Sequence, residues 1–141
     1  MNWKQFDKGV FLVNVLGIVY NPKAKQILIG KRKEKDPHLE KLSWTFPGGR
    51  PAYNEDLEFY LKFNIKIKTG LDAEIKKIVF AKTYPEKREF LSIYYLCEVV
   101  SGKEKAGEKF VEIKWVKPTD VQKYFTTSLH PKLLEYLKTL H

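Results

Sequence analysis

The chain has 141 residues, of which 43% are hydrophobic and 14% aromatic. A chain of this size and composition buries a core of its own, so intrinsic disorder is excluded and one domain over residues 1–141 is expected. The sequence contains no run of about 18 apolar residues, which argues against a membrane-spanning helix. The net charge of +9 favours anionic partners such as nucleotides, phosphorylated metabolites or RNA, although a lysine-rich, heat-stable surface has the same composition.

Two features favour a cytoplasmic protein. Residues 1–8 lack the apolar core of a signal peptide. Cys97 is the single cysteine, so the chain cannot form an internal disulfide. Because Cys97 lies within an apolar stretch, we expect it to be a small buried hydrophobe.

The chain begins with two predicted strands. Residues 10–20 are apolar and β-branched and end at an Asn-Pro turn signal, and residues 26–32 form a second run of the same kind. The short segment between them predicts a hairpin. Arg32 ends the second strand, where a surface position is the simplest interpretation.

A short strand at residues 44–46 leads into Pro47-Gly48-Gly49. Glycine has no Cβ, so the two glycines allow a tight bend and a close approach of backbone to a ligand. By itself, a turn of this kind is weak evidence for a ligand-binding motif. It becomes stronger evidence only when other motif residues stand at a fixed spacing from it.

Residues 54–68 allow two readings. Apolar and polar residues alternate from Phe59 to Lys68, which by itself predicts a strand. A helix would have Asn54 as its N-cap and acidic residues in its first turn. It would carry two apolar stripes on opposite sides: Leu57, Leu61 and Ile65 toward the sheet, and Phe59, Phe63 and Ile67 toward a second partner.

The second half of the chain predicts three more strands and two helices. Residues 73–84, 88–100 and 110–116 are the strands. A short helix is expected to begin at Pro118, and a last helix at His130-Pro131, with leucines along one side.

The spacing from Gly49 to Leu71 resembles the signature of the Nudix hydrolases. That signature runs Gly, five residues, Glu, seven residues, then Arg-Glu-aliphatic-x-Glu-Glu-x-Gly-aliphatic, and the chain places Gly49, Glu55 and Gly70-Leu71 in frame. Residues 112–116 likewise match the Glu-x-x-Trp-Val that relatives often carry. The resemblance implies an α/β/α sandwich around a mixed β-sheet, and a helix rather than a strand over residues 54–68.

The metal-binding carboxylates of the signature are absent, although Glu55 is kept. Phe63 and Asn64 stand where the family has Arg-Glu, and Ile67 and Lys68 stand where it has Glu-Glu. The resemblance implies that those glutamates hold Mg²⁺ or Mn²⁺, which prefer oxygen ligands. Lys68 instead brings a positive charge to the place of the dication, so metal binding is disfavoured.

The leading hypothesis is therefore a nucleotide- or phosphate-binding protein in which hydrolysis is lost or weak. Its expected ligand-binding residues are cations for phosphate, aromatic rings for a base and glycines for close approach: Arg32, Trp44, Phe46, Gly48, Gly49, Arg50 and Lys68.

Two alternatives stay open. One is a Mg²⁺- or Mn²⁺-dependent pyrophosphohydrolase of nucleoside diphosphate derivatives, with Glu112 and Glu55 as non-standard metal ligands or catalytic acids. The other is a scaffold that forms a homodimer through Phe59, Phe63 and Ile67, or else an RNA-binding module.

Overall fold

The computed structural model describes residues 9–34, 43–84, 87–126 and 129–140. The N-terminal residues 1–8, to which the expectation about a signal peptide applies, lie outside this part of the chain. The elements follow one another as β1 (Leu12–Asn21), β2 (Gln26–Arg32), β3 (Trp44–Thr45), β4 (Gly48–Gly49), α1 (Leu57–Thr69), β5 (Leu71–Tyr84), β6 (Lys87–Gly102), β7 (Phe110–Val116), the 3-10 turn η2 (Pro118–Asp120), α2 (Val121–Tyr124) and α3 (Pro131–Lys138).

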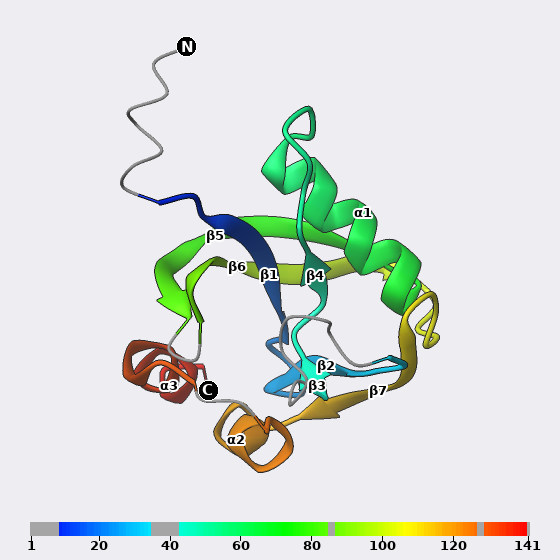
Figure 1. Cartoon of the computed structure of the whole chain (residues 1–141). Helices are drawn as coiled ribbons and strands as arrows, with labels where there is room; N and C mark the ends of the chain where they lie inside the picture. The colour runs from blue at the N-terminus through cyan, green and yellow to red at the C-terminus, as the bar shows by residue number, and fades with distance from the viewer. Residues whose placement is uncertain (1–8, 35–42, 85–86, 127–128, 141) are drawn as a thin grey trace.

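The strands form a mixed sheet with the order β3-β2-β1-β6-β5. β1 runs parallel to β6 and antiparallel to β2, while β4 pairs with β1 and β7 pairs with β2. β1 thus joins the two parts of the sheet. In Figure 1, β4 lies beside β1, with which it pairs.

Helices cover both faces of the sheet, as Figure 1 shows. Val15 and Val19 of β1 belong to a core that includes Leu61 and Ile65 of α1. Ile18 of β1 belongs to a second core, which includes residues of α2 and α3. Successive side chains of a strand point to opposite faces, so one strand supplies both cores. The predicted α/β/α sandwich around a mixed sheet is confirmed.

Residues 57–69 are helical, so the helix prediction is correct and the strand reading is wrong. The alternation of apolar residues is overridden because Leu61 and Ile65 are fully buried against the sheet at helical spacing. The N-cap is Asp56 rather than Asn54, and its side chain accepts a hydrogen bond from the Phe59 N–H at 2.9 Å. Gly70, with φ of 77°, ends the helix in the left-handed conformation expected of it.

The remaining elements agree with the prediction to within a few residues. β5 begins at Leu71 and β6 ends at Gly102, so both are longer than predicted, and their pairing contains several register shifts. Cys97 is fully buried, and its burial, with a smaller effect of Glu58, raises the pKa of the thiol to about 12. In the described residues, no helix is long and apolar enough to cross a membrane.

Candidate functional site

A cavity of about 430 Å³ opens between α1, the β4 turn, β6 and the loop that precedes β7. Its lining falls into two parts. The charged end is the group of residues that interact around Lys68, namely Arg32, Lys68, Glu108 and Lys109. The aromatic end is the set of packed rings Phe46, Tyr94 and Phe125. Five of the predicted ligand-binding residues line it together with Lys68: Arg32, Phe46, Gly48, Gly49 and Arg50.

Lys68 lies at the charged end, in the last turn of α1. Its Nζ donates a hydrogen bond to the backbone carbonyl of Gly48 and lies 5.8 Å from the centre of the Phe110 ring. Burial lowers the pKa of Lys68 from 10.5 to about 8, with further lowering from Arg32 and Lys109 and an opposing effect of Glu108. The ammonium is therefore held in a dry and already positive environment.

Arg32 and Lys109 are brought to the same end by backbone pairing. Arg32 ends β2, and its Nε donates to the carbonyl of Glu34 at 3.2 Å. The next residue, Lys33, donates its N–H to the carbonyl of Lys109 at 2.7 Å, which ties the end of β2 to the loop before β7. These contacts place cations from α1, β2 and a distant loop around one space.

Arg50 lies farther along the cavity, beside β1 and β6. Its Nε donates to Oδ1 of Asn14 at 2.8 Å, and its guanidinium stands 4.5 Å above the Phe90 ring. An arginine fixed in this way presents a planar set of donors with little further loss of side-chain freedom. That geometry suits a carboxylate or a phosphate.

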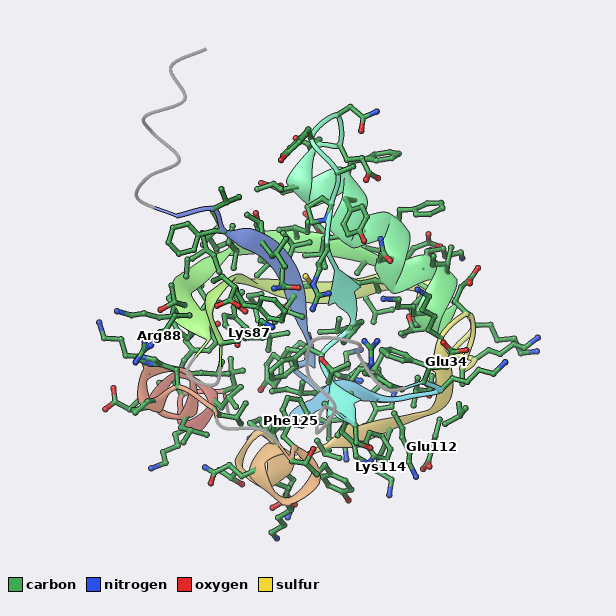
Figure 2. The ribbon with its side chains drawn as sticks, in the orientation of Figure 1. Glu34, Lys87, Arg88, Glu112, Lys114 and Phe125 are labelled. Atoms are coloured by element: carbon green, nitrogen blue, oxygen red, sulfur yellow. The ribbon has the colours of Figure 1, made fainter. Side chains whose placement is uncertain are left out.

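Phe46 anchors the aromatic end and is almost fully buried. It packs edge-on against Tyr94 and Phe125, with ring centres 6.1 and 5.0 Å away. Phe125, labelled in Figure 2, follows α2 in the chain and lines the cavity. Trp44, also predicted to bind a base, is absent from the described lining and packs against Tyr124 at 5.5 Å.

The two glycines of β4 are needed for internal packing. A Cβ on Gly48 would lie 2.0 Å from the carbonyl oxygen of Val15, and one on Gly49 would lie 2.5 Å from the Tyr60 hydroxyl. Close approach to β1 and α1 therefore explains both glycines without a ligand. The same close approach places the Gly48 carbonyl within reach of Lys68.

The acids predicted to replace the lost carboxylates lie elsewhere. Glu55 is exposed in the turn before α1, where its Oε1 accepts the Ala52 N–H at 2.8 Å. Glu112 is exposed on β7, and Figure 2 shows it pointing outward near Lys114. Neither lines the cavity, in which Glu108 is the one described carboxylate.

The described residues do not fit a Mg²⁺ or Mn²⁺ site. They contain no group of three or more His, Cys, Asp or Glu side chains placed to hold a metal ion. On the cavity side of α1, Asn64 is neutral and donates its Nδ2 to the Tyr60 carbonyl at 3.0 Å, and Ile67 has no ligand atom. Hard dications require several oxygen ligands and gain from carboxylate charge, which this wall does not supply.

Several cavity residues were missed by the sequence reasoning, chiefly because they come from distant strands and loops. Asn14 and Ser92 are polar residues within apolar strands, and they are register partners in the β1–β6 pair. A polar residue inside an apolar strand was the signal that could have revealed them. Glu108 and Lys109 had no comparable signal, since they belong to a charged loop.

The predicted second stripe of α1 does not form one surface. Phe59 and Phe63 are 72% and 54% exposed, whereas Ile67 lines the cavity. The twist of the helix turns the last member of the stripe away from the other two.

Comparison with known proteins gives a consistent result. Residues 10–137 match the family described as NUDIX domain. No curated protein matches the chain significantly.

The fold is shared with solved structures of low sequence identity. The chain is similar to a Nudix hydrolase from Nitrosomonas europaea, with a TM-score of 0.73, 18% identity, and coverage of 92% of this chain and 71% of the other. The MutT protein from Methanosarcina mazei Go1 gives a TM-score of 0.73 and 19% identity, with coverage of 92% and 94%. An ADP-ribose pyrophosphatase from Streptococcus suis gives 0.68 and 16%, with coverage of 91% and 90%. Since the family match spans most of its length, the chain belongs to the Nudix domain family.

Proposed function

We propose that this protein binds a nucleotide or another phosphorylated small molecule in the cavity beside α1, without a metal ion, and hydrolyses it weakly or not at all. The observation that carries the proposal is the position of Lys68. Its ammonium lies in the cavity, on the turn of α1 where the family signature has glutamates.

The chemistry of hydrolysis explains why this matters. Cleaving a phosphoanhydride requires neutralisation of phosphate charge and activation of a water molecule, and a metal ion supplies both. A lysine ammonium supplies the first by donating hydrogen bonds to phosphate oxygens. It does not generate hydroxide, so binding is retained while the hydrolytic step loses its main source of acceleration.

The proposed ligand spans the two ends of the cavity. Its phosphates lie at the charged end with Arg32, Lys68 and Lys109, and Arg50 supplies a further cation along the wall. Its base lies against the aromatic end, where Phe46 and Phe125 provide apolar surface.

Calorimetric titration with ATP and with ADP-ribose, in buffer containing EDTA, tests the proposal. We expect binding by the wild-type protein, and affinity about tenfold weaker in Lys68→Met, because one charge-assisted contact to phosphate is lost. Lys62→Met is the matched control, since Lys62 is an exposed lysine on the same helix, and it should bind as the wild type does. Absence of binding by the wild type would contradict the proposal.

The second candidate is a metal-dependent pyrophosphohydrolase, which family membership favours. Products of ATP and ADP-ribose are followed with Mg²⁺ or Mn²⁺ present. Turnover that is lost in Glu112→Gln, in Glu55→Gln or in Glu108→Gln would identify the carboxylate that supports it. Such turnover would replace our leading proposal.

Homodimerisation through α1 stays a prediction, now restricted to Phe59 and Phe63. Sedimentation velocity of the wild type and of a Phe59→Ser, Phe63→Ser variant tests it, and a monomeric wild type would contradict it. RNA binding has the net charge of +9 as its support, which does not distinguish RNA from other anions.

A further inference from the structure

The charges that line the cavity bear on the ionic form of the ligand as well as on its chemical class. Arg32, Arg50, Lys68 and Lys109 line the cavity, and Glu108 is the one carboxylate in the described lining. These groups come from β2, the segment after β4, α1 and the loop before β7. Among the described lining residues, the four cations thus outnumber the one carboxylate.

The lowered pKa of Lys68 is consistent with this excess of positive charge. After burial, the causes that disfavour its ammonium are the charges of Arg32 and Lys109, and Glu108 opposes them only in part. A site whose own cations repel one another gains from a ligand that brings a high negative charge.

We propose that this cavity takes the uncomplexed polyphosphate and discriminates against its Mg²⁺ complex, so that Mg²⁺ antagonises ligand binding. This inference rests on the proposed function and goes beyond it in naming the ionic form of the ligand. It predicts the reverse of a metal-dependent site, in which Mg²⁺ promotes binding of the nucleotide.

Three physical effects act in the same direction. Mg²⁺ cancels two of the negative charges through which the phosphates attract the four cations. The bound ion would also approach the Lys68 ammonium, which is repulsive in a partly dry site. Finally, Mg²⁺ retains several waters, and the described wall of α1 supplies no carboxylate to replace them.

The experiment compares AMP, ADP, ATP and inorganic triphosphate by calorimetry at constant ionic strength. In EDTA, affinity is expected to rise with the number of phosphates, by about tenfold from AMP to ATP, since each adds charge to a cationic site. Saturating Mg²⁺ is expected to weaken ATP binding by about tenfold. Exchange-inert chromium(III)–ATP should bind at least as weakly as the magnesium complex, because the trivalent ion cancels one more charge.

Each outcome has a separate meaning. ATP that binds equally well or more tightly with Mg²⁺ overturns this inference and leaves the proposed function standing. ATP that binds in neither condition overturns both. Triphosphate that matches ATP in its response to Mg²⁺ supports the cations, rather than the aromatic end, as the source of the discrimination.

A charge-reversal variant tests the role of the α1 lysine. In Lys68→Glu, the weakening of ATP binding by Mg²⁺ should shrink to less than about twofold, because the repelling ammonium is replaced by a carboxylate. Lys62→Glu makes the same charge change at an exposed position of the same helix and should keep the full effect of about tenfold. Equal responses in the two variants would overturn the role given to Lys68. If Lys68→Glu does not fold, as judged by thermal unfolding, the wild-type comparison with chromium(III)–ATP decides the inference.

Discussion

The sheet-facing and cavity-facing sides of α1 differ in how far they keep the residue pattern of the family. The sheet-facing side, with Leu61, Ile65 and Thr69 fully buried, packs as a helix must pack in this fold. The cavity-facing side, with Asn64, Ile67 and Lys68, lacks the carboxylates of the family signature. One helix thus combines a packed apolar side with a cavity side that carries a neutral amide, an aliphatic side chain and an ammonium.

The difference shows that the two roles depend on different atoms. Burial of Leu61 and Ile65 fixes where the helix lies, and Gly70 fixes where it ends. The side chains of Asn64, Ile67 and Lys68 on the cavity side belong neither to this core nor to the Gly70 cap. This separation is why a family's fold is weaker evidence for activity than the residues of the site.

The largest expected effect lies on the sheet-facing side. Ile65→Ala should lower the free energy of unfolding by about 2–5 kcal/mol, because it opens a void beside β1 and β6. The Cδ1 atom of Ile65 lies 3.1 Å from where a Cβ on Gly17 would stand. Because Gly17 has no side chain, it cannot fill the space that the substitution leaves. Chemical denaturation measures the change.

Phe63→Ala is the control on the same helix. Its side chain is 54% exposed, and we expect a change within about 0.5 kcal/mol. Equal losses in the two variants would show that Phe63 is also covered, and that α1 has no free face there.

A smaller effect is expected on the cavity-facing side, and it depends on pH. Because burial lowers the pKa of Lys68 from 10.5 to about 8, the folded state binds fewer protons than the unfolded state between these values. The resulting loss of stability is fully present below pH 8 and is removed as the pH rises toward 10.5. Lys68→Met should therefore be more stable than the wild type at neutral pH, by on the order of 2 kcal/mol, and this advantage should vanish at high pH.

Urea denaturation of the wild type and of Lys68→Met gives their difference in free energy of unfolding. Measurements at about pH 7 and about pH 10 span most of the titration of Lys68. Comparing the two proteins at each pH removes the contribution of the tyrosines, which they share. A constant difference across the pH range would mean that the Lys68 ammonium is well solvated, which would also weaken the proposed cationic cavity.

The smallest effect concerns the start of α1. Asp56→Ala should cost about 1 kcal/mol, because its side chain caps the Phe59 N–H. Asn54→Ala, at the position that the sequence favoured as the cap, should change stability by less than about 0.5 kcal/mol. The opposite ranking, measured by thermal unfolding, would return the cap to Asn54.

Much of the fold could be predicted from local sequence. Gly70 closes α1 because glycine adopts a positive φ at low cost, and the leucines of the last helix mark its buried side. The spacing from Gly49 to Leu71 indicated the family frame, and residues 64, 67 and 68 are Asn, Ile and Lys at the positions where the resemblance places glutamates. These features depend on residue type and spacing within a single segment.

The site depended on contacts between distant segments. Sequence spacing does not reveal that Glu112 points away from the cavity, or that Lys109 joins Arg32 and Lys68 within it. Strand pairing places Asn14 beside Ser92, although the two lie in different thirds of the chain. Residue type and spacing were thus enough to predict the frame of the fold and to show which residues occupy positions 64, 67 and 68. The packing of distant strands and loops determined which charged side chains lie near one another. Electrostatic interactions depend on distance and burial in space, and not on order along the chain.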